Sequence, residues 1–178
     1  MQVKSGLTNS LDLSGTGSCA AFNFRRTARA VTRLYDLGLD PAGIRATQFA
    51  ILTAVAKFQP VAISRIGEIL ILDLTTLTRS LQLLKKQGLL EISPRSVRRQ
   101  RFLNLTDKAV KVLEIAVPLW RKVQAEFVAN LAGTNWKEFR DELERLSRMA
   151  VELEAAALRS ESNTAPDPTL PDSDNNAK

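Results

Sequence analysis

The stretch ILDLTTLTRSLQLLKKQGLLEISPRSVRRQRFLNL, residues 71–105, decides the fold. In its first half, leucines recur at steps of three and four, at Leu74, Leu77, Leu81 and Leu84. This spacing predicts a helix over residues 74–87 that packs all four leucines on the core and ends at Gly88. The preceding residues ILD, 71–73, are expected to form a tight turn. Apolar and polar residues then alternate in LLEIS and RFLNL, so we expect two short strands joined by the loop PRSVRRQ.

The helix face opposite the leucines is polar and basic. At about 100° per residue, that face carries Thr75, Arg79, Gln82 and Lys86. Arginine can bind guanine and glutamine can bind adenine through two hydrogen bonds, threonine can contact phosphate or a thymine methyl, and lysine neutralises phosphate. Any amphipathic helix has a polar outer face, so this pattern alone is weak evidence for DNA binding. The evidence is stronger because the helix lies between a tight turn and a basic hairpin.

The predicted hairpin loop is strongly basic. Within seven residues it contains four arginines and no acidic residue: Arg95, Arg98, Arg99 and Arg101. Arginine side chains suit a narrow minor groove and also bind phosphates. Two helices joined by a tight turn and followed by such a hairpin are typical of a winged helix-turn-helix, with one helix in the major groove and the wing beside it. A solvated basic loop is the alternative.

Helical periodicity and capping residues predict five more helices. We expect them at residues 20–37, ended by Gly38; 47–57, capped by Thr47; 64–70, capped by Ser64; 107–131, capped by Thr106; and 136–158. The fold class is therefore mainly α with a small β-wing. It comprises a winged helix-turn-helix lobe over residues 47–105 and a helical dimerisation domain of residues 20–37 and 107–158.

The last two helices predict a homodimer. Their apolar residues repeat at alternating steps of three and four, from Val110 to Leu131 and from Trp136 to Ala157. Such seams offer more apolar surface than one small winged domain can cover, so a partner chain is expected. Pro118 should bend the first of these helices, which would let it curve around a neighbour. An intramolecular helical hairpin is the alternative.

The charge balance favours a polyanionic partner. The 178 residues contain 25 Lys and Arg against 19 Asp and Glu, a formal charge of +6. The first predicted helix carries a basic stripe of Arg25, Arg29 and Arg33. For this stripe, ion pairs with a neighbouring helix or simple solvation are favoured over contact with DNA.

The ends of the chain differ in composition from the middle. Residues 1–18 are rich in Ser, Gly and Thr and predict a flexible arm, while residues 160–178 are acidic and rich in Pro and predict a disordered tail. Residues 1–18 lack the apolar core of a signal peptide, and no run is long enough to span a membrane. We therefore expect a cytoplasmic protein with no membrane contact.

The scarcity of histidine and cysteine argues against metal and disulfide chemistry. The chain has no histidine and a single cysteine, Cys19, so neither an internal disulfide nor a metal site is expected, and no cofactor is predicted. Cys19 lies at the start of the first predicted helix, where helix amides favour a thiolate that peroxides can oxidise. The favoured alternative is a buried cysteine acting as a small apolar residue.

At these residues the sequence resembles the MarR family of transcriptional regulators. The segments that carry the resemblance lie between residues 19 and 155, and LDLTTLTRSLQLLKKQGLL followed by RRQRFLNLTDKA is the most specific. The resemblance implies a triangular homodimer with one winged lobe per chain. By position, it assigns Thr75, Thr76, Thr78, Arg79 and Gln82 to the recognition helix, and Arg98 and Arg99 to the wing. Val97 stands where the family commonly has Asp, so the ion pair that would orient Arg99 is absent.

These observations favour a sequence-specific regulator that binds double-stranded DNA as a homodimer at an inverted repeat. The resemblance adds that such proteins usually repress promoters and release DNA when a small molecule or an oxidant acts. An enzyme is disfavoured, because the chain has no phosphate-binding loop and no nucleophile or metal motif. A protein-interaction module is the third possibility, but it does not require the basic face that Arg79, Lys85 and Lys86 create.

Overall fold

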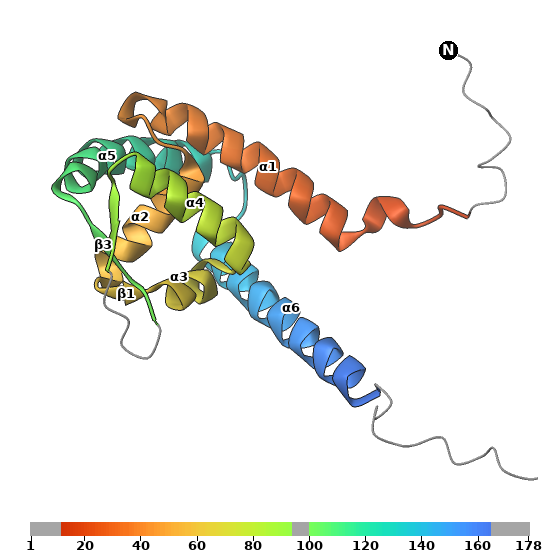
Figure 1. Ribbon diagram of the computed structural model, residues 1–178. Coiled ribbons are helices and arrows are strands. Elements are labelled where there is room, and N and C mark those ends of the chain that lie inside the picture. Colours follow the sequence, from red (N-terminus) through yellow and green to blue (C-terminus); the bar gives the residue numbers. More distant parts are fainter. Residues whose placement is uncertain (1–11, 94–99, 165–178) are drawn as a thin grey trace, which may run out of the picture. The chain divides into compact units, whose positions relative to one another are not determined.

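The computed structural model describes residues 12–93 and 100–164 of the chain (Figure 1). Its helices are η1 (Thr16–Ser18), α1 (Ala20–Leu39), η2 (Asp40–Ala42), α2 (Ala46–Phe58), α3 (Ile63–Leu70), α4 (Leu74–Lys86), α5 (Asp107–Ala129) and α6 (Trp136–Thr164). Its strands are β1 (Val61–Ala62), β2 (Leu90–Ile92) and β3 (Phe102–Leu105). The chain divides into two units, Met1–Phe127 and Val128–Lys178. The predicted class, mainly helical with a small antiparallel sheet, is confirmed.

The sheet has three antiparallel strands in the order β1-β3-β2. Leu103 of β3 pairs with Val61 on one side and with Ile92 on the other. The two strands predicted from alternating residues are therefore confirmed as β2 and β3. The sequence does not predict β1, because a strand of two residues is too short to show an alternating pattern.

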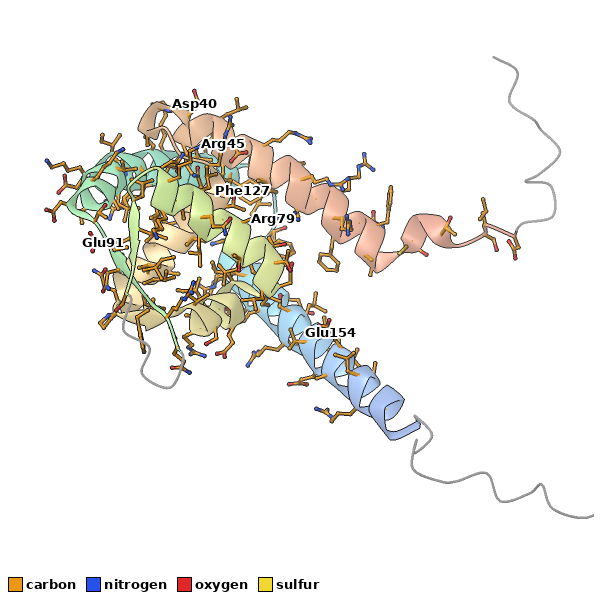
Figure 2. The ribbon with its side chains drawn as sticks, in the orientation of Figure 1. Asp40, Arg45, Arg79, Glu91, Phe127 and Glu154 are labelled. Atoms are coloured by element: carbon orange, nitrogen blue, oxygen red, sulfur yellow. The ribbon has the colours of Figure 1, made fainter. Side chains whose placement is uncertain are left out.

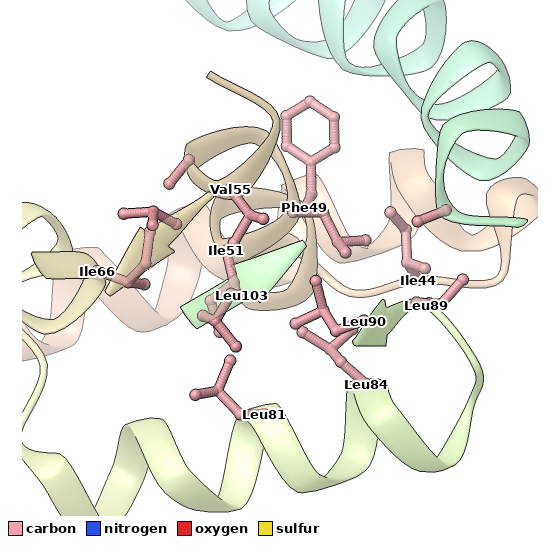
Figure 3. Close-up of a cluster of buried hydrophobic side chains, with 14 of the residues drawn as sticks. Ile44, Phe49, Ile51, Val55, Ile66, Leu81, Leu84, Leu89, Leu90 and Leu103 are labelled. Carbon is pink, nitrogen blue, oxygen red and sulfur yellow. The ribbon is translucent and has the colours of Figure 1, made fainter. Parts of the chain in front are cut away.

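Three leucines attach α4 to the rest of its unit. The exposed fractions of Leu77, Leu81 and Leu84 are 1%, 2% and 0%. They belong to one apolar cluster with α2 and the sheet, and Figure 3 shows Leu81 pointing toward Leu103 and Leu84 toward Leu90. Burying a leucine stabilises a fold by about 1.5–3 kcal/mol, so this cluster fixes which face of α4 is left outside.

The prediction that Leu74 packs on the core is wrong. Its exposed fraction is 69%, although it continues the leucine spacing of Leu77, Leu81 and Leu84. At about 100° per residue Leu74 lies only about 20° around the helix from the buried Leu81, so its direction around the helix does not explain its exposure. Leu74 is the first residue of α4 and lies outside the apolar cluster, which on this helix begins at Leu77.

The predicted end of the first helix at Gly38 is also wrong, because α1 continues through Gly38 to Leu39. A Cβ atom at Gly38 would overlap the side chain of Val123 on α5. The glycine thus lets α1 and α5 approach closely instead of ending the helix. Beside it, the Tyr35 hydroxyl donates a hydrogen bond to Oε1 of Gln124, and partial burial raises the pKa of Tyr35.

Two helices begin earlier than the predicted caps at Thr47 and Ser64. α2 begins at Ala46, whose amide donates to Oδ1 of Asp36 at 2.8 Å. α3 begins at Ile63, whose amide donates to the carbonyl of Arg101, the residue before β3, at 3.1 Å. In both cases a partner distant in sequence satisfies the first amide of the helix. The predicted cap Thr106 is confirmed, because its Oγ1 accepts the amide of Ala109 at 3.1 Å.

Parts of both predicted flexible ends are ordered. In the N-terminal arm, residues 12–18 form a turn followed by η1, and Asp12 accepts the amide of Ser14 at 2.9 Å. At the other end α6 continues to Thr164, five residues into the predicted tail. Residues 160–164 contain no proline that would interrupt the helix. Residues 1–11 and 165–178 lie outside the described residues, and no helix within 12–93 and 100–164 is long and apolar enough to cross a membrane.

We predict that Gly38→Ala destabilises the protein by about 1–3 kcal/mol, because the added methyl overlaps Val123 in a packed contact. Thermal and denaturant unfolding would measure the loss. Gly17→Ala is the control, since a Cβ atom there meets no neighbour within 4 Å. Adding Val123→Ala to Gly38→Ala should restore part of the stability. An unchanged midpoint for Gly38→Ala would contradict the proposed contact.

Candidate nucleic-acid interface

The structure places the predicted recognition residues on the outer side of α4. All six are exposed: Thr75, Thr76, Thr78, Arg79, Gln82 and Lys86. At about 100° per residue, Thr75, Arg79 and Lys86 point away from the buried leucines, while Thr78 and Gln82 turn toward one flank. Thr76 lies on the opposite flank. Figure 2 shows the side chains of α4, with Arg79 labelled.

This face carries cationic groups without acidic neighbours on the same helix. α4 contains Arg79, Lys85 and Lys86 and no Asp or Glu. All three side chains are exposed, and none makes an ion pair with any residue in 12–93 or 100–164. Three cations free to meet an external anion give this surface an affinity for phosphate.

Asp73 fixes the start of α4. Its Oδ1 accepts the amide of Thr76 at 2.8 Å, which satisfies one free donor of the first helical turn. The hydrogen bonds from Thr76 hold the pKa of the Asp73 carboxyl below its ordinary value of 3.8. The sequence pattern predicts this residue only as part of a turn. The available signal was an Asp directly before the first leucine of an amphipathic helix.

A polar network fixes the other end of α4. The buried Gln48 of α2 donates from Nε2 to Oε1 of Gln87 at 2.8 Å and accepts the amide of Arg45 at 2.8 Å. The carbonyl of Gln87 also accepts Nζ of Lys108 on α5 at 2.8 Å. The C-terminal end of α4 is therefore bonded to both α2 and α5. Sequence reasoning missed this network because its members are far apart in the chain.

A groove of about 370 Å³ runs between α4 and the hairpin strands. From α4 it is lined by Leu74, Thr78, Leu81 and Gln82; from β2 and the two residues before β3 by Ile92, Gln100 and Arg101; and from β1 and the start of α3 by Ala62, Ile63 and Ser64. Arg101 is exposed at this groove, so it supplies a cation beside the recognition face, by which we mean the outer side of α4 that carries the six predicted recognition residues. Arg95, Arg98 and Arg99, the other predicted wing arginines, lie outside the described residues.

Two further predictions concern α1. Cys19 is exposed at the N-cap of α1, so its interpretation as a buried apolar residue is wrong for the single chain. Arg25, Arg29 and Arg33 are exposed and make no ion pair within residues 12–93 and 100–164, which agrees with simple solvation. In the same described part of the chain, no three His, Cys, Asp or Glu side chains gather where they could hold a metal ion.

No known family model and no curated protein matches the sequence, whereas many solved structures resemble the fold. The chain is 32% identical to the M. tuberculosis transcriptional regulator MosR, solved in complex with DNA, with a TM-score of 0.70 over 76% of this chain and 98% of MosR. A MarR-family transcriptional regulator from Rhodococcus sp. RHA1 matches at 16% identity, with a TM-score of 0.63 over 76% of this chain and 96% of that one. PcaV of Streptomyces coelicolor, solved with its natural ligand, matches at 22% identity, with a TM-score of 0.68 over 79% of this chain and 99% of PcaV.

The lowered pKa of Asp73 predicts a pH-dependent contribution of this cap to stability. Because the folded-state pKa lies below 3.8, the contribution is present at pH values above 3.8 and is lost as the pH falls through the lowered value. Denaturant unfolding of the wild type and Asp73→Ala across this range should show a stability difference that narrows in acid. Asp73→Asn is the control, since its uncharged oxygen still caps the helix and its advantage over Asp73→Ala should not vary with pH. A wild-type advantage that is constant with pH would refute the role of the charged carboxylate.

Proposed function

Because the chain belongs to the MarR family of DNA-binding transcriptional regulators, we propose that it binds a specific duplex sequence and represses transcription until a signal releases it. The observation that carries this proposal is the 32% identity across 98% of MosR, a regulator solved on DNA, together with the exposed cationic face of α4. Members of the family are regulators and not enzymes, so the prediction that the chain is not an enzyme is confirmed. The proposal places the protein in the cytoplasm with the DNA it binds.

In the proposed complex α4 enters the major groove and its outer face contacts base edges. Arg79 would donate two hydrogen bonds to a guanine, and Gln82 would bind an adenine. Thr75, Thr76 and Thr78 would contact phosphates or thymine methyls, and Lys86 would neutralise a phosphate. Arg95, Arg98 and Arg99 would bind the adjacent minor groove and backbone, with Arg101 at the base of the wing. A protein-interaction module remains less favoured, because it gives no reason for unpaired cations along α4.

We infer that the active form is a homodimer. In the single chain, large apolar side chains are exposed along two helices: Phe22, Phe24, Leu34 and Leu37 on α1, and Phe139, Met149, Val151, Leu153 and Leu158 on α6. Apolar surface of this extent is typical of an interface with another chain. In a two-fold dimer, two α4 helices would enter successive major grooves about 34 Å apart and contact an inverted repeat.

The releasing signal is proposed to be a small molecule or an oxidant. The exposed Cys19 supports the oxidant, because its thiol is accessible to peroxide in the single chain. A small-molecule effector is supported by the fold, since PcaV was solved with its natural ligand.

Arg79→Ala should reduce discrimination between the preferred duplex and random duplex by about 1–3 kcal/mol, because one bidentate base contact is lost. Binding titrations on both duplexes at the same salt concentration would measure the change. Arg33→Ala is the matched control, since it removes the same charge from the exposed surface of α1. If Arg79→Ala weakened binding to both duplexes equally, Arg79 would bind phosphate and not bases.

If Cys19 is the sensor, hydrogen peroxide oxidises its thiol to a sulfenic acid and is itself reduced to water, and the oxidised protein leaves the DNA. The measurement compares binding of the preferred duplex by wild type and Cys19→Ser, each with and without peroxide. Release of the wild type alone is the expected result. Equal behaviour of the two proteins would remove Cys19 from the mechanism and leave a small molecule as the proposed signal.

A further inference from the structure

Leu74 is a large apolar side chain exposed among the polar residues of the recognition face. It is the first residue of α4, has an exposed fraction of 69%, and lines the groove together with Thr78 and Gln82. Helical rotation places these three side chains on the same flank, facing the hairpin. Packing in the core therefore does not explain why a large apolar residue stands at position 74.

Its position places Leu74 where base contacts are made in helix-turn-helix proteins. The N-terminal residues of a recognition helix approach base edges most closely, and Asp73 fixes the first turn of α4 through the amide of Thr76. In the major groove the thymine C5 methyl is the one apolar group that a standard base presents. A leucine cannot form a hydrogen bond with a base edge, so the contact available to it there is with this methyl.

We propose that Leu74 is a specificity-determining residue that packs on the C5 methyl of one thymine in each half-site. The inference rests on the proposed function, namely that α4 enters the major groove. It adds apolar recognition of thymine to the hydrogen-bonding contacts of Arg79 and Gln82.

The surroundings of Leu74 favour DNA over an apolar protein surface as the occupant. Thr75, Thr78 and Gln82 flank it on α4, and Arg101 lies across the groove. Ile71, the other exposed apolar residue nearby in sequence, does not line this groove. The other apolar residues that line the groove, Ala62, Ile63, Leu81 and Ile92, are buried or half-buried, so Leu74 is the exposed apolar side chain among exposed polar and cationic ones. One exposed leucine in such surroundings matches an isolated methyl group in the polar major groove, whereas a protein partner would require a continuous exposed apolar patch.

The test uses the full-length chain and the duplex that it selects from random-sequence DNA. Each thymine of that duplex is replaced singly by deoxyuridine, which removes the C5 methyl and leaves every hydrogen-bonding group in place. Affinities are measured for wild type, Leu74→Ala, Leu74→Met and Leu83→Ala. Leu83 is the matched control, because it is 49% exposed on the opposite flank of the same helix.

At one thymine of each half-site, replacement by deoxyuridine should weaken wild-type binding about fourfold. This is the change in affinity expected when one buried methyl group is removed from an interface. Leu74→Ala should bind the thymine and deoxyuridine duplexes equally, whereas Leu74→Met and Leu83→Ala should retain the wild-type sensitivity. The inference is overturned if no thymine substitution weakens the wild type, or if Leu74→Ala remains as sensitive as the wild type. Failure of the chain to select any duplex would instead overturn the proposed function, and the inference with it.

Discussion

The burial of Leu77, Leu81 and Leu84 is the interaction on which the rest of the interface depends. These side chains pack against α2 and the sheet, so α4 cannot rotate about its axis without exposing them to water. Its rotation in turn decides that Arg79 and Lys86 face outward and that Leu74 and Gln82 line the groove beside the hairpin. The chemistry of the surface is thus set by apolar contacts beneath it.

Polar contacts then hold the two ends of α4. At the N-terminal end the Asp73 carboxylate caps the first turn, and at the C-terminal end Gln48 and Lys108 bond to Gln87. Because Asp36 of α1 binds the first amide of α2, the same network extends from α1 through α2 to α4. A hydrogen-bonded link of this kind would let a displacement of α1 change the position of α4, which the proposed release by a signal requires.

Much of this fold follows from local patterns, and the departures have physical causes. The leucine spacing predicts α4, and the alternating residues predict β2 and β3, since each pattern reports which face of an element is buried. Gly38 was misassigned because its role is set by Val123 of α5, a contact that no local pattern records. The prediction that Leu74 is buried is wrong because the leucine spacing shows which side of a helix is apolar, but not how far along the helix the core extends. The exposure of the predicted recognition residues on α4 could be predicted residue by residue, but the caps of this helix and the Gln48 network depend on partners brought together only by folding.

In the proposed complex, two copies of α4 occupy successive major grooves of one duplex. Dimethyl sulfate footprinting of the full-length chain on its selected duplex tests this most directly, since the reagent reports guanine N7 in the major groove. If two copies of α4 bind in this way, two protected patches are expected about one helical turn apart, 10–10.5 base pairs from centre to centre. A single protected patch, or binding that leaves every guanine N7 reactive, would contradict it.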